Sequence, residues 1–365
     1  MPIDFNQQRW NKIKDDSRKW WAGELGRPLI QVRLKGHDSK RAEPALPYHE
    51  FTSYYNLSIP AEDIVHRIDY DLSTTKYLGD GFPTFWPNFG PGVIAAFMGA
   101  KLQNGVDTVW FHPENMVEMD KLKFKFIEDN VWYQRIKNIT RACNKRWDGL
   151  VLIGLTDLGG NLDILHSFRP SEHLLYDLID SPDNVKRLTW EAHHAWWQYF
   201  EEFSSICQPF NPGYSGWTPL YSESPYYMLQ CDFCYMISPA MFDEFVKPEL
   251  KASADRLVNA FYHLDGQGEL PHLDSLLEID SLKGIQWVPG EGSPDVSKWP
   301  EVYKKIHDSG RLTQIFSNQY KGNPCDLLDI LYEQVGDVSN VAYMIDADIS
   351  QEKKILQLLK KYRVN

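Results

Sequence analysis

The sequence predicts an α/β fold, a single (β/α)8 barrel over residues 1–365 that begins with an N-terminal helical extension over residues 1–27. Two observations predict this fold. Short apolar runs alternate with amphipathic stretches, and from Leu150 onward the alternation repeats about six times. The first run is followed by Leu34-Lys35-Gly36-His37-Asp38, which lacks the glycine-rich phosphate turn of a doubly wound sheet. Strands separated by helices pair in parallel through right-handed crossovers, which favours a closed barrel.

Each expected strand is a run that is too short for a helix and rich in Val, Ile, Tyr, Phe and Trp. In chain order these runs are Pro28–Leu34, Thr108–Phe111, Leu150–Thr156, Tyr214–Pro219, Tyr227–Ile237, Ala260–Leu264, Gly284–Val288, Leu312–Phe316 and Val341–Ile345.

The expected helices are marked by their first residues. Ser181-Pro182-Asp183 and Ser238-Pro239 each place a serine at the cap position and a proline in the first turn. A serine also opens the helix at Ser171. Further helices are expected over Pro271–Leu277, Trp299–His307, Asp326–Gln334 and Gln351–Tyr362.

The composition narrows the class of protein. Hydrophobic residues make up 43% and charged residues 24%, which is ordinary for a globular chain with a core. Asp and Glu number 50 against 38 Lys and Arg, and the basic residues are scattered, which argues against a nucleic-acid partner. No signal peptide or membrane-spanning apolar run is visible, and the five cysteines form no disulfide framework. We therefore expect a cytoplasmic protein without a membrane partner.

Barrel active sites form at the carboxyl ends of the strands, so polar residues directly after the apolar runs are the first candidates. By this criterion the candidates are Arg33, His37, Asp80, His112, Asp157, the Cys231–Cys234 region, His263, Asp265, Glu291, Asn318 and Asp346.

His263 and Asp265 are the leading pair. Residues two apart on a strand point to the same face, and Gly266 follows directly. On the inner face such a pair can ligate a metal, relay a proton or orient a substrate. The alternative is structural, with the two side chains satisfying each other or the loop backbone.

Three further candidates lie in loops or turns. Asp80 lies in a glycine-rich turn near Trp86, where it can act as an acid or base, or form an Asx-turn. Asp157 precedes Gly159-Gly160, where the backbone can approach a ligand closely. The Cys231-x-x-Cys234 motif is half a metal site at most, and buried thiols explain it better.

Substrate contacts are assigned to a wider set. Arg33 can clamp a carboxylate, and His166 and Arg169 can contact an anion. The full set is Arg33, His37, Trp86, His166, Arg169, Tyr227 and Gln267.

Several motifs in order resemble a known family. They are Thr156-Asp157-Leu158-Gly159-Gly160, Ser181-Pro182-Asp183, Ile237-Ser238-Pro239, and Tyr262-His263-Leu264-Asp265-Gly266, with Gly79-Asp80 upstream. Together they resemble the uroporphyrinogen decarboxylase superfamily, from about Pro28 to the end. The resemblance implies a (β/α)8 barrel and, in addition, a homodimer.

One branch of the superfamily decarboxylates a polycarboxylate porphyrinogen without a cofactor. It uses an N-terminal segment of the form Met-Arg-Gln-Ala-Gly-Arg and an Asp that holds the pyrroles. Here the matching segment keeps Arg33 but has His37 in place of the second arginine, and Asp80 matches the Asp loosely. The departures argue against true decarboxylation.

The other branch is the corrinoid-dependent methyltransferases, in which a His-x-Cys and a later Cys bind zinc. The resemblance maps these ligands onto His263, Asp265 and Asp346, so it implies a divalent metal such as zinc there. It also implies a corrinoid carried by a partner protein. Carboxylates in place of both cysteines suit oxygen substrates better than thiol activation.

The leading hypothesis is a corrinoid-linked methyltransferase-like enzyme that acts on a small substrate in the barrel mouth. Its catalytic residues would be His263, Asp265, Asp80 and Asp157. The first alternative is a cofactor-free decarboxylase that uses Arg33, His37 and Asp80. The second is a non-catalytic barrel that binds a tetrapyrrole or a corrinoid.

Overall fold

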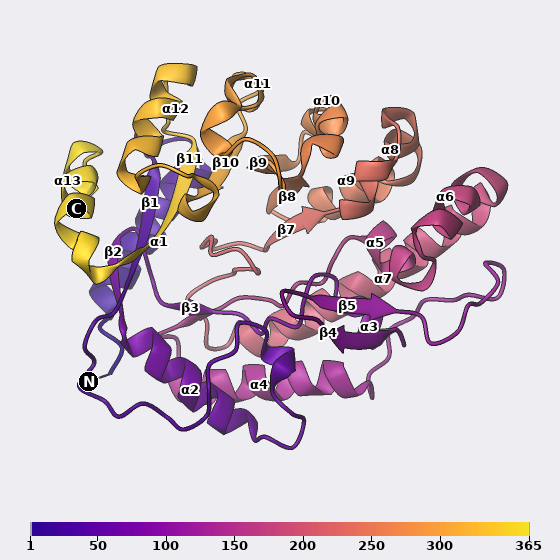
Figure 1. Ribbon diagram of the computed structural model, residues 1–365, viewed down its shortest axis with the longest axis horizontal. Helices are drawn as coiled ribbons and strands as arrows, with labels where there is room; N and C mark the ends of the chain where they lie inside the picture. The colour runs from indigo at the N-terminus through magenta and orange to yellow at the C-terminus, as the bar shows by residue number, and fades with distance from the viewer. Residues whose placement is uncertain (1, 365) are drawn as a thin grey trace.

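The computed structural model describes residues 2–364 and has a mixed α/β architecture around a largely parallel sheet (Figure 1). Within these residues the main sheet has seven strands in the order β2-β1-β11-β10-β9-β8-β7. All neighbours pair in parallel except β2, which runs antiparallel to β1. The strands are β1 (Leu29–Lys35), β2 (Thr75–Gly79), β7 (Tyr226–Gln230), β8 (Asn259–Asp265), β9 (Leu282–Val288), β10 (Leu312–Phe316) and β11 (Val341–Asp348).

The hydrogen-bonded ladder does not close into the expected eight-stranded barrel within residues 2–364. Strands β3 (Thr84–Phe85) and β6 (Leu152–Ile153) form a separate parallel pair. The expected strand Tyr214–Pro219 is irregular, although the Leu155 N–H donates to the Ser215 carbonyl at 3.0 Å. A Cβ at Gly154 would lie 2.3 Å from the Gly216 oxygen, so the backbones meet here too closely for side chains on a regular ladder.

The strand expected over Thr108–Phe111 forms, but it lies outside the main sheet. Strands β4 (Lys101–Asn104) and β5 (Val109–His112) pair with each other as an antiparallel hairpin. The residues after β5 therefore do not join the carboxyl end of the parallel sheet.

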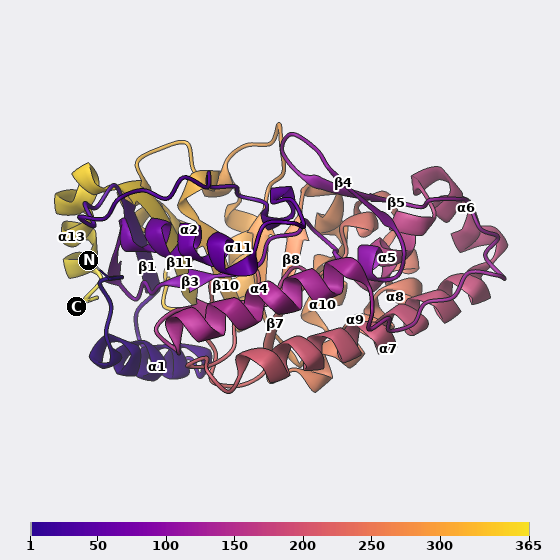
Figure 2. The same ribbon diagram turned by 90° about the horizontal axis from the view of Figure 1, so that it is seen from below.

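Helices cover the outside of the strands. In Figure 1, helices α10 to α13 arch over β8–β11, and α2, α4 and α7 pack side by side on the far side of the molecule, as Figure 2 also shows. The helices are α1 (Gln7–Trp21), α2 (Ala61–Ser73), α3 (Ile94–Phe97), α4 (Val131–Trp147), α5 (Asn161–Phe168), α6 (Ser171–Asp180), α7 (Pro182–Cys207), α8 (Pro239–Phe245), α9 (Lys247–Arg256), α10 (Leu273–Leu277), α11 (Pro300–Asp308), α12 (Leu327–Val335) and α13 (Glu352–Lys361).

The expected helix starts are largely confirmed. The Ser238 hydroxyl accepts a hydrogen bond from the Met241 N–H at 3.3 Å and caps α8. Ser181 occupies the cap position of α7 and Pro182 its first turn, but the Ser181 side chain makes no capping bond. The fixed φ of proline therefore marks this start better than the serine does.

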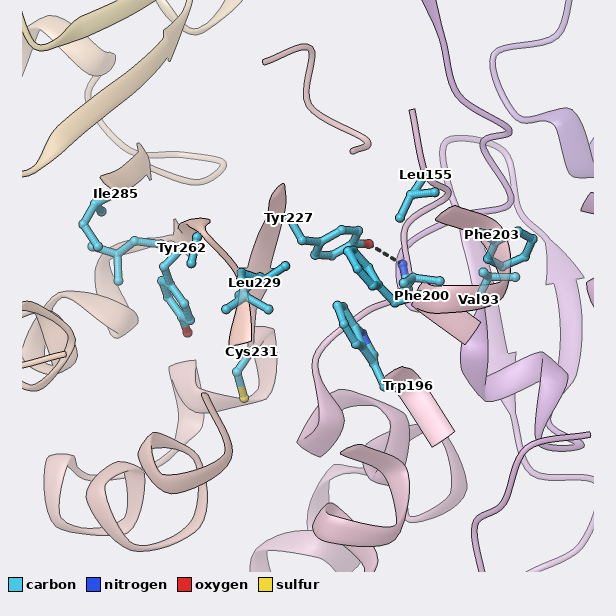
Figure 3. Packing of buried hydrophobic residues seen from close by; sticks show 14 of the residues in the cluster. Val93, Leu155, Trp196, Phe200, Phe203, Tyr227, Leu229, Cys231, Tyr262 and Ile285 are labelled. Atoms are coloured by element: carbon cyan, nitrogen blue, oxygen red, sulfur yellow. Dashed lines mark hydrogen bonds between the residues drawn. The ribbon is translucent and has the colours of Figure 1, made fainter. Parts of the chain in front are cut away.

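Side chains alternate between the two faces of the sheet. Tyr227, Tyr262 and Ile285 face the helices and join the large core shown in Figure 3. Met228, Phe261 and Leu312 belong to a second, smaller buried cluster that includes Trp20. His263 follows Tyr262 in the chain, so its side chain lies on the same inner face as Phe261. Among the described helices, none combines the length and the apolar character needed to cross a bilayer.

Candidate active site

His263 and Asp265 share the inner face at the carboxyl end of β8, as their spacing predicts. The His263 Nε2 lies 3.8 Å from the Asp265 Oδ2. The Trp217 ring stands edge-on to the imidazole, with centroids 5.1 Å apart and planes at 87°. The indole Nε1–H donates to the Met228 carbonyl at 3.3 Å, which holds the tryptophan against β7. An imidazole, a carboxylate and an aromatic wall therefore meet at one strand end.

Asp232 adds a second carboxylate from the neighbouring strand end. It opens the turn that follows β7, and this turn is held by Asp163 of α5. The Asp163 carboxylate accepts hydrogen bonds from the Asp232 N–H at 3.1 Å and the Phe233 N–H at 2.8 Å. The Asp232 side chain is exposed. Desolvation by the surrounding protein and the charges of Asp163 and Asp265 raise its pKa to about 7.

Asp157 is a buried acid on the loop that follows β6. Burial raises its pKa to about 7, against the opposing effect of two backbone N–H groups. Those donors belong to Gly159 at 2.9 Å and Gly92 at 3.4 Å. The charge of His263 acts on this carboxyl in the opposite direction to burial, so the two residues influence each other.

For His263, neighbouring charges affect the pKa of the imidazole more than burial does. Burial lowers its pKa, but the nearby carboxylates of Asp265 and Asp232 outweigh burial and raise it. Behind the pair lies Glu269, which is fully buried and accepts the Asp265 N–H at 3.2 Å. Burial raises the pKa of Glu269 well above its usual range. The site is thus rich in groups that hold a proton near neutral pH.

From the sequence, Glu269 and Trp217 were not singled out, and Asp232 was a candidate only as part of the Cys231–Cys234 region. The signal for Asp232 was present, because it follows a strand end as the other candidates do. The expected strand over Tyr227–Ile237 was too long, however, and the structure ends β7 at Gln230. Ending the strand there would have singled out Asp232 within that region.

The structure does not bring Asp346 together with His263 and Asp265. Asp346 pairs instead with Arg33, with the Nε–Oδ1 and Nη2–Oδ2 distances both 2.6 Å. Across residues 2–364 no group of three or more His, Cys, Asp or Glu side chains is arranged to hold a metal ion. The residues present therefore do not fit the zinc site that the family resemblance implied.

Asp80 lies at the other end of the sheet. Its carboxylate accepts two bonds from Arg27, at 2.7 and 2.9 Å, and one from the Ile30 N–H at 2.9 Å. Ile30 is the second residue of β1, so Asp80 sits at the amino end of that strand while His263 approaches the carboxyl end of β8. The structure gives the buried Asp80 a half-buried structural partner, Arg27, and no contact with the His263 site.

Tyr227 also faces away from the site. Its hydroxyl accepts the Leu158 N–H at 2.7 Å and donates to the Thr156 carbonyl at 3.0 Å. Its ring packs against Trp196 on the helix side of the sheet (Figure 3). Tyr227 thereby braces the loop that carries Asp157, and it reaches the site only through that loop.

His166 and Arg169 are occupied by structural partners. The His166 Nε2 lies 2.8 Å from the Ser171 hydroxyl, and burial lowers the pKa of this imidazole. Arg169 forms two bonds with Asp177, at 2.6 and 3.0 Å. Neither side chain is available to clamp an anion in this arrangement.

The remaining candidates lie in loops or on the surface. Gln267 follows Gly266 and donates to the Ser293 hydroxyl at 2.9 Å, close to the site. His37 and Trp86 are half-buried just after β1 and β3. The residues His112, Glu291 and Asn318 are exposed, and Cys231 and Cys234 are buried thiols.

Comparisons with known proteins bear on the fold. No family model matches the chain, and no curated protein matches it. Among solved structures it is similar to a methyltransferase from Methanosarcina mazei, at 12% sequence identity and a TM-score of 0.60. The match covers 96% of this chain and 99% of that one. The likeness shows that the two chains share a fold over nearly their whole lengths.

Proposed function

We propose that this chain is a methyltransferase-like enzyme that moves a methyl group between a small substrate and a corrinoid carried by a partner protein. One observation carries the proposal: His263 and Asp265 at the end of β8, Asp232 after the neighbouring β7, and the buried Asp157, whose pKa responds to the charge of His263, form one cluster of acid–base side chains. The fold shared with a methyltransferase and the motifs that resemble the corrinoid-dependent branch support it.

The cluster suits a methyl group bound to oxygen or nitrogen. When the bond between carbon and that atom breaks, the leaving atom must gain a proton. A general acid works best when its pKa lies near the operating pH, and Asp157 and Asp232 each have a pKa of about 7. The corrinoid, when its carrier is bound, supplies the centre that accepts or donates the methyl group. The role of this chain is to orient the substrate and deliver the proton.

The rim of the site offers an apolar surface beside these acids. The Tyr235 ring lies against Gly266 and Gly268, where an added Cβ would approach the ring to 3.0 and 2.7 Å. Both Tyr235 and Met236 are exposed, with 54% and 42% of their surface accessible. An exposed apolar surface beside acidic side chains fits a small methylated substrate, and it offers a partner protein a place to bind.

The geometry gives less support to cofactor-free decarboxylation. That reaction would need free cations for a polycarboxylate, and Arg33 is neutralised by Asp346. Asp80, another of the three residues assigned to it, lies at the amino end of β1. We therefore do not propose it.

The test uses the full-length protein with free cobalamin in its reduced state and a panel of methanol, methylamines and methoxybenzoates. Loss of the methyl donor and formation of its demethylated product are followed by mass spectrometry. We expect turnover with one class of donor, which Asp157→Asn and His263→Ala abolish. The matched control is Asp274→Asn, because Asp274 is 75% exposed and forms an ion pair with Lys305 on the surface.

Three outcomes would contradict the proposal or the role it gives to Asp157. Absence of demethylation with every donor, together with tight cobalamin binding, would identify a non-catalytic binding barrel and overturn the proposal. Release of carbon dioxide from a porphyrinogen would overturn it in favour of the decarboxylase. Equal activity in Asp157→Asn and the control would contradict the assignment of the proton donor.

A further inference from the structure

Four polar side chains lie next to one another across the inner face of the sheet. Strand register pairs Gln230 with His263, His263 with Gln286, and Gln286 with Gln314. We call Gln230, His263, Gln286 and Gln314 the amide row. Below it, on the same strands, lies a row of Met228, Phe261, Gly284 and Leu312, three of which belong to the smaller apolar core.

The amide row is buried, which makes its hydrogen bonds energetically important. Gln286 is 1% exposed and Gln314 is not exposed at all. A buried amide that lacks a hydrogen-bond partner lowers the stability of the fold by on the order of 1–3 kcal/mol. The hydrogen bonds that these side chains make are therefore needed to offset their burial. Phe261 packs so closely on Gly284 that a Cβ there would lie 2.1 Å from its ring. The ring of Phe261 therefore fills the space beside Gly284, two residues before Gln286 on the same strand.

Two hydrogen bonds join three members of the row. The His263 Nδ1–H donates to the Gln286 Oε1. The Gln286 Nε2–H then donates to the Gln314 Oε1 at 2.8 Å. Because an amide oxygen can only accept, this chain requires the hydrogen to be on Nδ1 of His263. The Nε2 atom is left on the side of Asp265, at 3.8 Å from its carboxylate.

Gln230 lies on the opposite side of His263 and takes no part in this chain. It is 6% exposed, and its Oε1 is buried without a hydrogen-bond partner. The row is therefore asymmetric around His263: the ring is hydrogen-bonded toward β9 and β10, whereas among the described residues no hydrogen bond joins it to Gln230 on β7.

We propose that Gln286 and Gln314 are positioning residues, which hold the His263 ring with Nδ1 toward the sheet and Nε2 toward Asp265. The assignment of a reacting role to Nε2 rests on the proposed function, but the orientation of the ring does not. Without the Gln286 oxygen, rotation by 180° about χ2 would exchange the positions of the two ring edges. Fixing the ring through a second hydrogen bond is how histidines in catalytic sites are commonly oriented.

The test is an NMR experiment on the full chain labelled with 15N-histidine, with the His263 signals assigned through His263→Gln. Long-range proton–nitrogen correlations report which ring nitrogen carries the hydrogen. We expect a protonated, hydrogen-bonded Nδ1 in the natural protein and loss of this signature in Gln286→Leu. Where methyl transfer is measured, kcat should fall about 10- to 100-fold while KM changes little.

The chain provides a matched control and a rescue. Gln230→Leu removes a buried glutamine of the same row that does not bond to the ring, so it should leave the signature intact. Gln286→Glu keeps an acceptor oxygen in place and should retain it. If Gln286→Leu does not fold, Gln286→Asn withdraws the acceptor while keeping the amide, and it should also lose the signature.

A natural signature in Gln286→Leu or Gln286→Asn would overturn the inference. Equal loss in Gln230→Leu would do the same, because it would show a general effect of disturbing the row. The spectra are recorded without substrate, so they decide the inference even if no methyl transfer is found. Conversely, if methyl transfer is found but the His263 NMR signature is unchanged in Gln286→Leu, the inference is overturned while the proposed function is retained.

Discussion

Arg33 and Asp346 face each other across β1 and β11, the first and last strands of the parallel sheet. They are register partners, and two parallel hydrogen bonds of 2.6 Å join the guanidinium to the carboxylate. Burial lowers the pKa of Arg33, but the Asp346 charge and hydrogen bonds outweigh burial and raise it. Arg33 was expected to bind substrate and Asp346 a metal, but in the structure these two residues bind each other.

This pair should contribute little to stability. The two side chains are 34% and 40% exposed, and exposed ion pairs are typically worth about 0.2–1 kcal/mol. We expect Asp346→Asn to lower the free energy of unfolding in urea by about 1 kcal/mol or less, and 1 M salt to remove most of the difference. The freed Arg33 should also bind benzoate more tightly, which isothermal calorimetry would detect. A loss above about 3 kcal/mol would show that the pair is effectively buried.

Asp80 should matter for stability rather than for catalysis. Its side chain is 2% exposed and paired with Arg27, and removing one partner of a buried pair costs about 3–5 kcal/mol. We expect Asp80→Leu to lose this amount in urea unfolding, and Arg27→Leu/Asp80→Leu to recover much of it. If Asp80→Asn abolished turnover at natural stability, Asp80 would have a catalytic role that its position does not explain.

The pKa of Asp157 predicts a pH dependence of stability. The pKa is raised to about 7 in the folded state, against about 3.9 in the unfolded chain. Between these values the folded state binds more protons, so the free energy of unfolding falls as the pH rises from about 4 to 7. The contribution is fully present below pH 4 and is lost above pH 7.

Asp157→Asn removes this titration while keeping an oxygen for the Gly159 and Gly92 N–H groups. At pH 8 the variant should therefore be more stable than the natural protein, by at most roughly 4 kcal/mol. At pH 4 the two should unfold at about the same urea concentration. A constant difference across this range would contradict the raised pKa of Asp157.

Chelation should have little effect on the folded protein. His263, Asp265 and Asp346 are not assembled into a ligand set. We expect dialysis against EDTA to leave the midpoint of thermal unfolding unchanged, and His263→Ala to leave the metal content unchanged by elemental analysis. Zinc bound in equal amount to the natural protein and lost from His263→Ala would show that the site rearranges around a metal.

The sequence predicted those features of the site that depend on residues close together in the chain. His263 and Asp265 share a face because side chains on a strand alternate with a period of two, whatever surrounds the strand. The bounds of β10 and the starts of α7 and α8 followed from apolar runs and from Ser-Pro pairs. Strand ends were predicted less well, and because the expected strand ran through Ile237, Asp232 was not singled out within the Cys231–Cys234 region.

Other features depend on which residues meet from distant parts of the chain. Whether the sheet closes, which end of β1 holds Asp80, and that Arg33 faces Asp346 are set by strand register and packing, which no local pattern encodes. The amide row also depends on strand register, since nothing in the sequence around Gln286 and Gln314 marks them as partners of His263. The sequence alone determined the alternation of strands and helices and the face that carries His263. Only the tertiary structure decided the partners of that residue, because hydrogen bonds and burial between strands depend on register rather than on spacing along the chain.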